Sequence, residues 1–197
     1  MKEITNFLLA GVGGQGTLLA SNVLAHIGVK AGFDVKKAEV HGMAQRGGSV
    51  SSHMRWGEKI YSPLIGRGEV DYLVVFEKLE ALRYVSMLRP GGTAIVGNMR
   101  IPPLSVSSGD DVYPGDEEVR RIVGEVTDDF HFVPSMRLAE EAGNVRAHNI
   151  VVLGVLSNFF AERVPPETWL EVIAEWVPQK FLEVNRQAFR MGREISQ

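Results

Sequence analysis

One short stretch constrains the fold more than any other, because it joins an apolar run to a glycine-rich turn and then to a helical pattern. The run "ITNFLLA" ends at Ala10, and "GVGGQGTLLASNVLAHIG" follows with glycines at positions 11, 13 and 16. This G-x-G-x-x-G spacing after a short apolar segment is typical of a Rossmann-like strand, turn and helix. The stretch therefore predicts a buried first strand, a tight turn and a helix that ends near Gly32.

The rest of the chain continues this alternation of short apolar runs and helical patterns. The run "DVKKAEV" (34–40) predicts a second strand that completes a βαβ unit with the first. Further core strands are predicted from "VDYLVVFE", "TAIVG" and "FHFVP", with helices between them and three more helical patterns after residue 146. We therefore expect an α/β fold with a doubly wound, mostly parallel, Rossmann-like sheet and a helical C-terminal end.

Two local features refine this expectation. The segments "SVSSHMRWG" and "KIYSPLI" flank Gly57-Glu58, and the first of them alternates in polarity, so they predict an inserted β-hairpin. Ser135 is expected to cap the helix "MRLAEEAG". Because no internal repeat or long linker interrupts the pattern, residues 1–197 are predicted to form a single domain.

The composition excludes several classes of function. The net charge is −3 and basic residues are scattered, which argues against a nucleic-acid partner. The chain has no cysteine, and its five histidines show no metal spacing, so we expect no metal site and no iron–sulfur cluster of its own. No apolar stretch reaches the length that spans a bilayer, so we expect no membrane partner and a cytoplasmic location.

The glycine turn is the first candidate site. Backbone N–H groups at a helix start can bind a pyrophosphate, and Glu39 at the end of the second predicted strand could accept a ribose hydroxyl. The alternative is close packing between the first strand and its helix, with no ligand. The candidate cofactor-binding residues are Gly11, Gly13, Gly14, Gln15 and Gly16.

The loop "EVHGMAQRGGSV" is the second candidate and the most unusual segment of the chain. Arg46 could hold a carboxylate or phosphate with its planar guanidinium, and His41 could transfer a proton. The alternative is a loop that docks onto another subunit. The candidate substrate or interface residues are Glu39, His41, Gln45, Arg46, Gly47 and Gly48.

The chain lacks a complete set of groups for a known reaction. It contains neither a G-x-x-x-x-G-K-[ST] phosphate loop nor the G-D-G and N-N pattern that binds magnesium and thiamine diphosphate. We therefore assign no catalytic residue to this chain and expect another chain to supply the reactive groups.

Several of these segments together resemble the γ-type domain of the 2-oxoacid:ferredoxin oxidoreductase family, in particular the small β subunits of its indolepyruvate-type enzymes. The resemblance covers nearly the whole chain in order, and "EVHGMAQRGGSV" is its most specific part. The segments that carry it are "GVGGQGTLLASNVLA", "KKAEVHGMAQRGGSVSSHMRWGEKIYSPLI", "DYLVVFEKLEALRYVSMLRPGGTAIV", "GNVRAHNIVVLGVL" and "KFLEVNRQAF".

The resemblance implies an enzyme of at least two subunits, a heterodimer or a higher hetero-oligomer. A large partner subunit would carry thiamine diphosphate, magnesium and iron–sulfur clusters, and this chain would bind no cofactor firmly. The complex would convert an arylpyruvate and coenzyme A into an acyl-CoA, with ferredoxin as electron acceptor. The alternatives are a γ subunit for pyruvate or another 2-oxoacid, a stand-alone nucleotide-binding oxidoreductase, and a purely structural scaffold.

Overall fold

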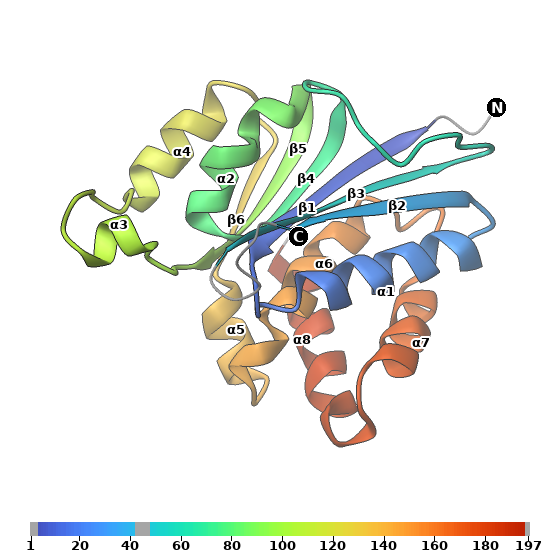
Figure 1. Ribbon diagram of the computed structural model, residues 1–197. Helices are drawn as coiled ribbons and strands as arrows, with labels where there is room; N and C mark the ends of the chain where they lie inside the picture. Colours follow the sequence, from blue (N-terminus) through green and yellow to red (C-terminus); the bar gives the residue numbers. More distant parts are fainter. Residues whose placement is uncertain (1–3, 42–47, 196–197) are drawn as a thin grey trace.

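The computed structural model describes residues 4–41 and 48–195, which form one six-stranded sheet with helices on both faces (Figure 1). The strand order is β2-β3-β1-β4-β5-β6. The strands are β1 (Thr5–Val12), β2 (Asp34–His41), β3 (Ser49–Gly57), β4 (Val70–Glu77), β5 (Leu88–Met99) and β6 (Phe130–Val133).

The helices account for most of the remaining chain. The α-helices are α1 (Thr17–Lys30), α2 (Lys78–Tyr84), α3 (Leu104–Ser107), α4 (Asp116–Gly124), α5 (Ser135–Glu141), α6 (His148–Asn158), α7 (Pro166–Trp176) and α8 (Leu182–Ile195). Three short 3-10 helices cover Val85–Met87, Val145–Ala147 and Gln179–Phe181. None of these helices in the described part of the chain is both long and apolar enough to cross a membrane.

The sheet is doubly wound, as the sequence predicts. Strands β1, β4, β5 and β6 are parallel, and the runs 7–10, 73–76 and 94–96 in β1, β4 and β5 are apolar and fully buried, as expected for strands covered on both faces. Helices α2 and α4 cover one face, and α1 and α5 to α8 lie on the other (Figure 1). Two separate apolar clusters, one on each side of the sheet, form the core.

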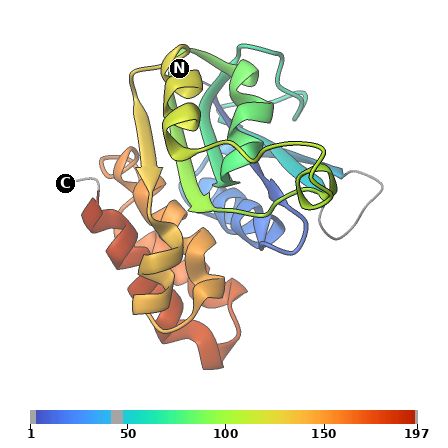
Figure 2. The same ribbon diagram turned by 90° about the vertical axis from the view of Figure 1, so that its left-hand side faces the viewer.

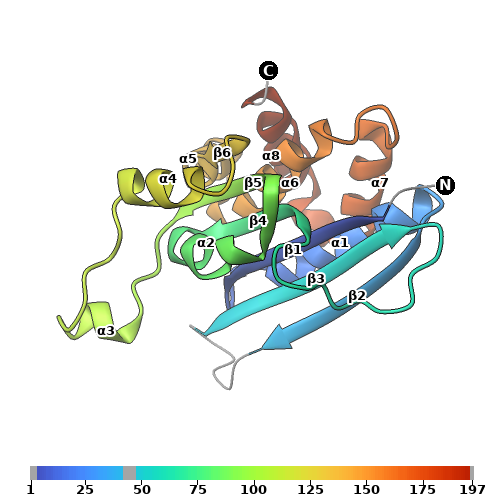
Figure 3. The ribbon, with the colours of Figure 1, turned by 90° about the horizontal axis from the view of Figure 1, so that it is seen from above.

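The inserted hairpin is present, but the prediction of its second arm was wrong. Strands β2 and β3 form it, with β3 antiparallel to both β2 and β1 (Figure 3). Residues 58–69 contain no strand; Pro63 lacks a backbone donor, and the segment is held by side chains such as Asp34, which accepts from the Ile60 N–H at 2.8 Å. The predicted βαβ unit is also split, because β3 lies between β1 and β2.

Helix α6 runs through the centre of the helical layer, and every residue from His148 to Ser157 is buried. It packs closely on α8 where Gly154 faces Gly192, since a Cβ atom on either glycine would collide with the backbone of the other helix. This contact joins the C-terminal helix to the centre of the fold.

The predicted cap of α5 was wrong. Ser135 is the first helical residue, and its hydroxyl does not cap the helix. Asn98 on β5 takes that role instead, because its Oδ1 accepts the Met136 N–H at 3.2 Å and the Ser135 hydroxyl at 3.5 Å. A side chain distant in sequence therefore satisfies the first turn of this helix.

Candidate functional site

The glycine turn lies at the carboxyl end of β1, and the side chain of Gln15 folds back over it. Gln15 is buried, its Oε1 accepts the Val12 N–H at 2.6 Å, and its Nε2 lies 2.7 Å from Met99 Sδ. A Cβ atom at Gly11 would lie 2.7 Å from both Gln15 Oε1 and Thr17 Oγ1. Gly11 is therefore needed because this side chain occupies the space next to it.

Gly16 is needed for a different contact, with helix α6. Its φ of 78° is in the left-handed region, and its carbonyl oxygen accepts from Asn149 Nδ2 at 3.0 Å. A Cβ atom at Gly16 would lie 2.5 Å from the same nitrogen. These contacts favour the packing interpretation of the turn at Gly11 and Gly16.

The outer side of the turn, at Gly14, has few neighbours among the described residues. Gly14 is exposed and has a φ of 102°, and a Cβ atom placed on it would have no described atom within 4 Å beyond its chain neighbours. The N-cap residue of α1 is Gly16, which has no side chain that could cap the helix. Among the described residues, the side of Gly14 therefore leaves room for a ligand at the start of α1.

A buried histidine lies beneath the turn. His148 is buried against Phe76, with ring centroids 6.2 Å apart, and its Nδ1 has no partner within the described structure. Burial lowers the pKa of His148 to about 4, although a hydrogen bond with the Gln15 backbone raises it in part. His148 is therefore neutral at pH 7 and packs under the turn without supplying positive charge to it.

The structure brings the turn and the end of the predicted loop together. The Gly13 N–H donates to the Gly48 carbonyl at 2.9 Å, and His41 and Gly11 pair with Val50 from its two sides. Candidate residues Gln45, Arg46 and Gly47 lie outside the described residues. Gly48, at one end of the loop, therefore lies beside the glycine turn, whereas His41, at the other end, is separated from β1 by strand β3.

Glu39 is not brought to the turn. It lies on the edge strand β2 opposite Ser52, and its Oε1 is 2.6 Å from Lys37 Nζ. Because β3 lies between β2 and β1, two strand spacings, about 10 Å, separate Glu39 from β1. This position does not support the expected hydrogen bond from a ribose hydroxyl at the turn to Glu39.

Sequence reasoning missed a buried carboxylate next to the loop. Glu80 is 2% exposed, accepts a hydrogen bond from the Ser49 hydroxyl and pairs with Arg83 Nε at 3.1 Å. The Ser49 hydroxyl also lies 3.1 Å from the Tyr84 hydroxyl. Burial raises the pKa of Glu80. The side chains of Glu80 and Tyr84 hold the first residue of β3 against helix α2.

A second buried carboxylate, Glu77, ends β4. Its Oε2 accepts the Glu80 N–H at 3.1 Å, and its Oε1 accepts the Ile101 N–H at 3.0 Å and the Tyr113 hydroxyl. Burial, and then the bond to Glu77, raise the pKa of Tyr113, so that its hydroxyl remains a donor. The sequence signal for Glu77 was its place directly after the apolar run "VDYLVVF" and before a helix.

The turn, Gly48 and these carboxylates lie at one place in the topology. Strands β1 and β4 are neighbours, and the helices that follow them, α1 and α2, cover opposite faces of the sheet. In open α/β sheets, ligands bind outside the carboxyl ends of the strands at such a switch point. Among the described residues, no group of three or more acidic, histidine or cysteine side chains could hold a metal ion here.

Fold and site together define an α/β protein with a glycine turn at its switch point and with Gly48 bonded to that turn. The family model described as "Pyruvate ferredoxin/flavodoxin oxidoreductase" matches residues 6–195. The chain is 42% identical to the "Indolepyruvate oxidoreductase subunit IorB" of Pyrococcus horikoshii, over 98% of this chain and 95% of that protein. The chain belongs to the pyruvate ferredoxin/flavodoxin oxidoreductase family.

Solved structures show the same fold. The gamma subunit of a keto/oxoacid ferredoxin oxidoreductase from Geobacter sulfurreducens matches with a TM-score of 0.70 and 23% identity, over 98% of both chains. A 2-oxoglutarate:ferredoxin oxidoreductase from Magnetococcus marinus, solved with 2-oxoglutarate, coenzyme A and succinyl-CoA, matches with a TM-score of 0.74 and 21% identity. All of this chain matches only 31% of that chain, so the fold is one part of a longer polypeptide there.

Proposed function

We propose that this chain is the small subunit of a 2-oxoacid:ferredoxin oxidoreductase that oxidatively decarboxylates an arylpyruvate, indolepyruvate in particular, to its acyl-CoA. The observation that carries the proposal is the 42% identity to an indolepyruvate oxidoreductase subunit over nearly the whole of both chains. Lower identity to proteins named for 2-oxoglutarate keeps other 2-oxoacids as the alternative substrates.

The reactive groups are proposed to lie on a larger partner subunit. Thiamine diphosphate, magnesium and iron–sulfur clusters would be bound there, and ferredoxin would accept the electrons. The absence of cysteine from the sequence supports this division, because iron–sulfur clusters are held mainly by cysteine thiolates. The same assembly, a heterodimer or higher hetero-oligomer, is proposed to work in the cytoplasm.

This chain is proposed to contribute the glycine turn and the loop beside it. The open side of Gly14 at the start of the 14-residue helix α1 could receive an anionic part of coenzyme A. His41, Gln45, Arg46 and Gly48 would shape the entrance to the active site of the partner. Docking of the loop onto the partner is the competing role.

Reconstitution tests the proposed function. The chain is purified alone and together with its thiamine diphosphate subunit, and coenzyme A-dependent reduction of ferredoxin is measured with indolepyruvate, pyruvate and 2-oxoglutarate. We expect turnover only in the mixture and fastest with indolepyruvate. Turnover by the isolated chain, or saturable NADH binding to it, would instead favour a stand-alone oxidoreductase.

The role of the loop is tested with Arg46→Ala in the same complex. Arg137→Ala is the matched control, because Arg137 is an exposed arginine on α5 whose ion pair is with Glu141 one helical turn away. Loss of turnover with an intact complex supports a role in the site, whereas loss of assembly supports docking. Turnover and assembly equal to the control would remove Arg46 from both roles.

A further inference from the structure

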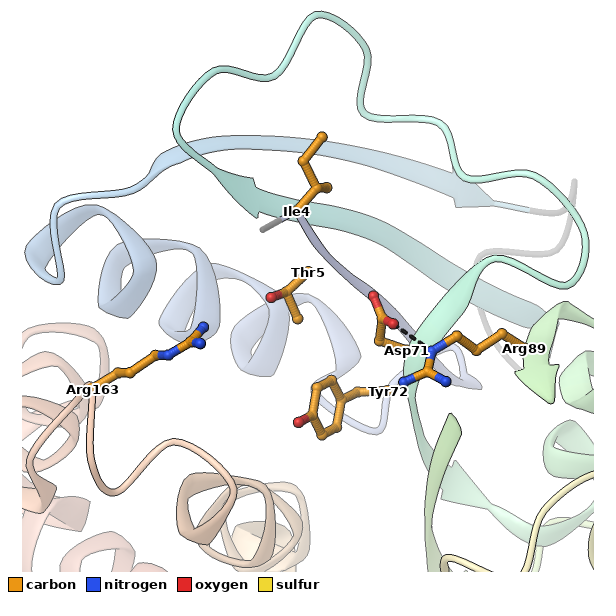
Figure 4. A pocket seen from close by; sticks show the side chains of 6 residues that line it. All are labelled: Ile4, Thr5, Asp71, Tyr72, Arg89 and Arg163. Atoms are coloured by element: carbon orange, nitrogen blue, oxygen red, sulfur yellow. Dashed lines mark hydrogen bonds and ion pairs between the residues drawn. The ribbon is translucent and has the colours of Figure 1, made fainter. Parts of the chain in front are cut away.

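A pocket lies where the central strands β1 and β4 begin, at the end of the strands opposite the glycine turn (Figure 4). Its volume is about 490 Å³, which is in the range of small-molecule sites. It is lined by Ile4, Thr5, Asp71, Tyr72, Arg89 and Arg163. Because β1 has eight residues, the pocket lies about 25 Å from the glycine turn and forms a separate feature.

Hydrogen-bond donors face this pocket without acceptors of their own. Arg163, in the segment between α6 and α7, forms no ion pair or side-chain hydrogen bond with any described residue. The hydroxyls of Thr5 and Tyr72 likewise have no hydrogen-bond partner in the part of the chain that the structure describes. Figure 4 shows Arg163 and Tyr72 extending toward the same space from different elements.

The two carboxylates near the pocket, Asp71 and Asp129, already have hydrogen-bond partners. Asp71 accepts from Arg89 Nε at 2.6 Å through Oδ1 and from the Asn6 N–H at 2.8 Å through Oδ2. Asp129, whose charge also reaches Tyr72, accepts from the Thr93 hydroxyl at 2.6 Å and lies 2.8 Å from His131 Nε2. Among the described residues around the pocket, the Arg163 cation has no ion-pair partner, and the Asp129 carboxylate is held by hydrogen bonds with Thr93 and His131.

Neighbouring aromatic rings hold the side chain of Tyr72 in place. Its ring lies 5.4 Å from that of Phe7 and 5.1 Å from that of Phe160, measured between centroids. Burial raises the pKa of Tyr72, so its hydroxyl remains protonated and able to donate. The ring and the side chain of Ile4 also give the pocket an apolar wall.

We propose that this pocket binds the carboxylate or phosphate group of a small molecule. Arg163 would supply the charge and a forked pair of N–H donors, and the hydroxyls of Tyr72 and Thr5 would donate the remaining hydrogen bonds. The Arg89–Asp71 ion pair would form the opposite wall. These residues have no part in the proposed enzyme function, so each proposal can fail without the other.

Titration of the full chain tests the pocket. Inorganic phosphate and benzoate are added separately and followed by NMR of the backbone amides and arginine side chains, with sodium chloride at matched ionic strength as the reference. We expect saturable shifts at Tyr72 and Arg163 with a Kd of about 1 mM or below. If phosphate saturates and benzoate does not, the ligand class is a phosphate; the reverse result indicates a carboxylate.

Single-residue variants test whether the anion binds at Arg163 and Tyr72. Arg163→Gln should weaken binding by about tenfold or more, and Tyr72→Phe by several-fold, because each removes a donor while keeping most of the shape. Arg121→Gln on α4, which removes an exposed arginine of a surface ion pair, should bind like the parent chain. Absence of saturable shifts with both anions, or equal binding by Arg163→Gln and Arg121→Gln, would overturn the proposal.

Discussion

The glycines of the turn are needed for different physical reasons, which their spacing does not reveal. Gly11 lies against the Gln15 side chain, Gly16 lies against Asn149, and a Cβ atom at Gly14 would meet no described atom within 4 Å. The sequence predicts a turn here, but the partners of Gly11 and Gly16 are side chains that only the folded chain brings in. Asn149 reaches the turn from 133 residues away.

This difference predicts unequal effects of two alanine substitutions. Gly14→Ala meets only the cost of a left-handed backbone, about 1 kcal/mol, whereas Gly16→Ala adds a collision with Asn149 and should lose about 3 kcal/mol. Urea unfolding of the purified chain measures both. In the Asn149→Ala background, Gly16→Ala should become milder; equal losses in both backgrounds would contradict a steric cause.

At the scale of elements, the structure differs from expectation in the segment that pairs with strand β3. The pattern of residues 49–57 predicts a strand, but it is compatible with pairing to 34–41 as well as to 59–65. The tertiary structure settles the choice, since β3 pairs with β1 and β2 on its two sides.

Residues 100–115, which carry α3, extend away from the sheet (Figure 2). They are held by Glu77, which accepts hydrogen bonds from the Ile101 N–H and the Tyr113 hydroxyl.

This attachment of residues 100–115 can be weakened by removing one atom. Tyr113→Phe removes the hydroxyl that donates to the buried Glu77 carboxylate, so we expect a loss of about 2 kcal/mol and faster proteolysis within 100–115. Limited proteolysis with mass spectrometry measures the second effect. Tyr61→Phe is the control, because Tyr61 is 85% exposed. Cleavage at the same rate in both variants would show that Tyr113 does not hold the segment.

At the scale of the molecule, the single-domain organisation remains a prediction that unfolding can test. The sheet is continuous from β2 to β6, and helix α6 contacts β4, β5, α1, α5 and α8. These connections join the N-terminal and C-terminal parts of the chain through one layered core. We therefore expect one cooperative transition, with circular dichroism and tryptophan fluorescence giving the same midpoint. Two separated midpoints would contradict a single domain.

The stability of this unit should depend on pH through His148. Its pKa is about 4 in the folded chain and near 6.5 when unfolded, so the unfolded state binds the proton more tightly. Stability is then complete above pH 6.5 and decreases as the pH falls toward 4, by roughly 3 kcal/mol. Urea midpoints across this range for the parent and His148→Gln chains isolate the effect. Parallel curves for the two chains would rule out this contribution of His148.

The sequence by itself determined the α/β class, most of the strands and helices, the glycine turn and the family resemblance. Those features depend on local periodicity and on short-range backbone geometry, which neighbouring residues specify. Only the tertiary structure decided that β3 separates β1 from β2, that Glu39 lies away from the turn, and that Asn98 and Asn149 satisfy distant backbone groups. Those outcomes depend on which unsatisfied backbone groups meet which side chains after folding, and no local pattern contains that information.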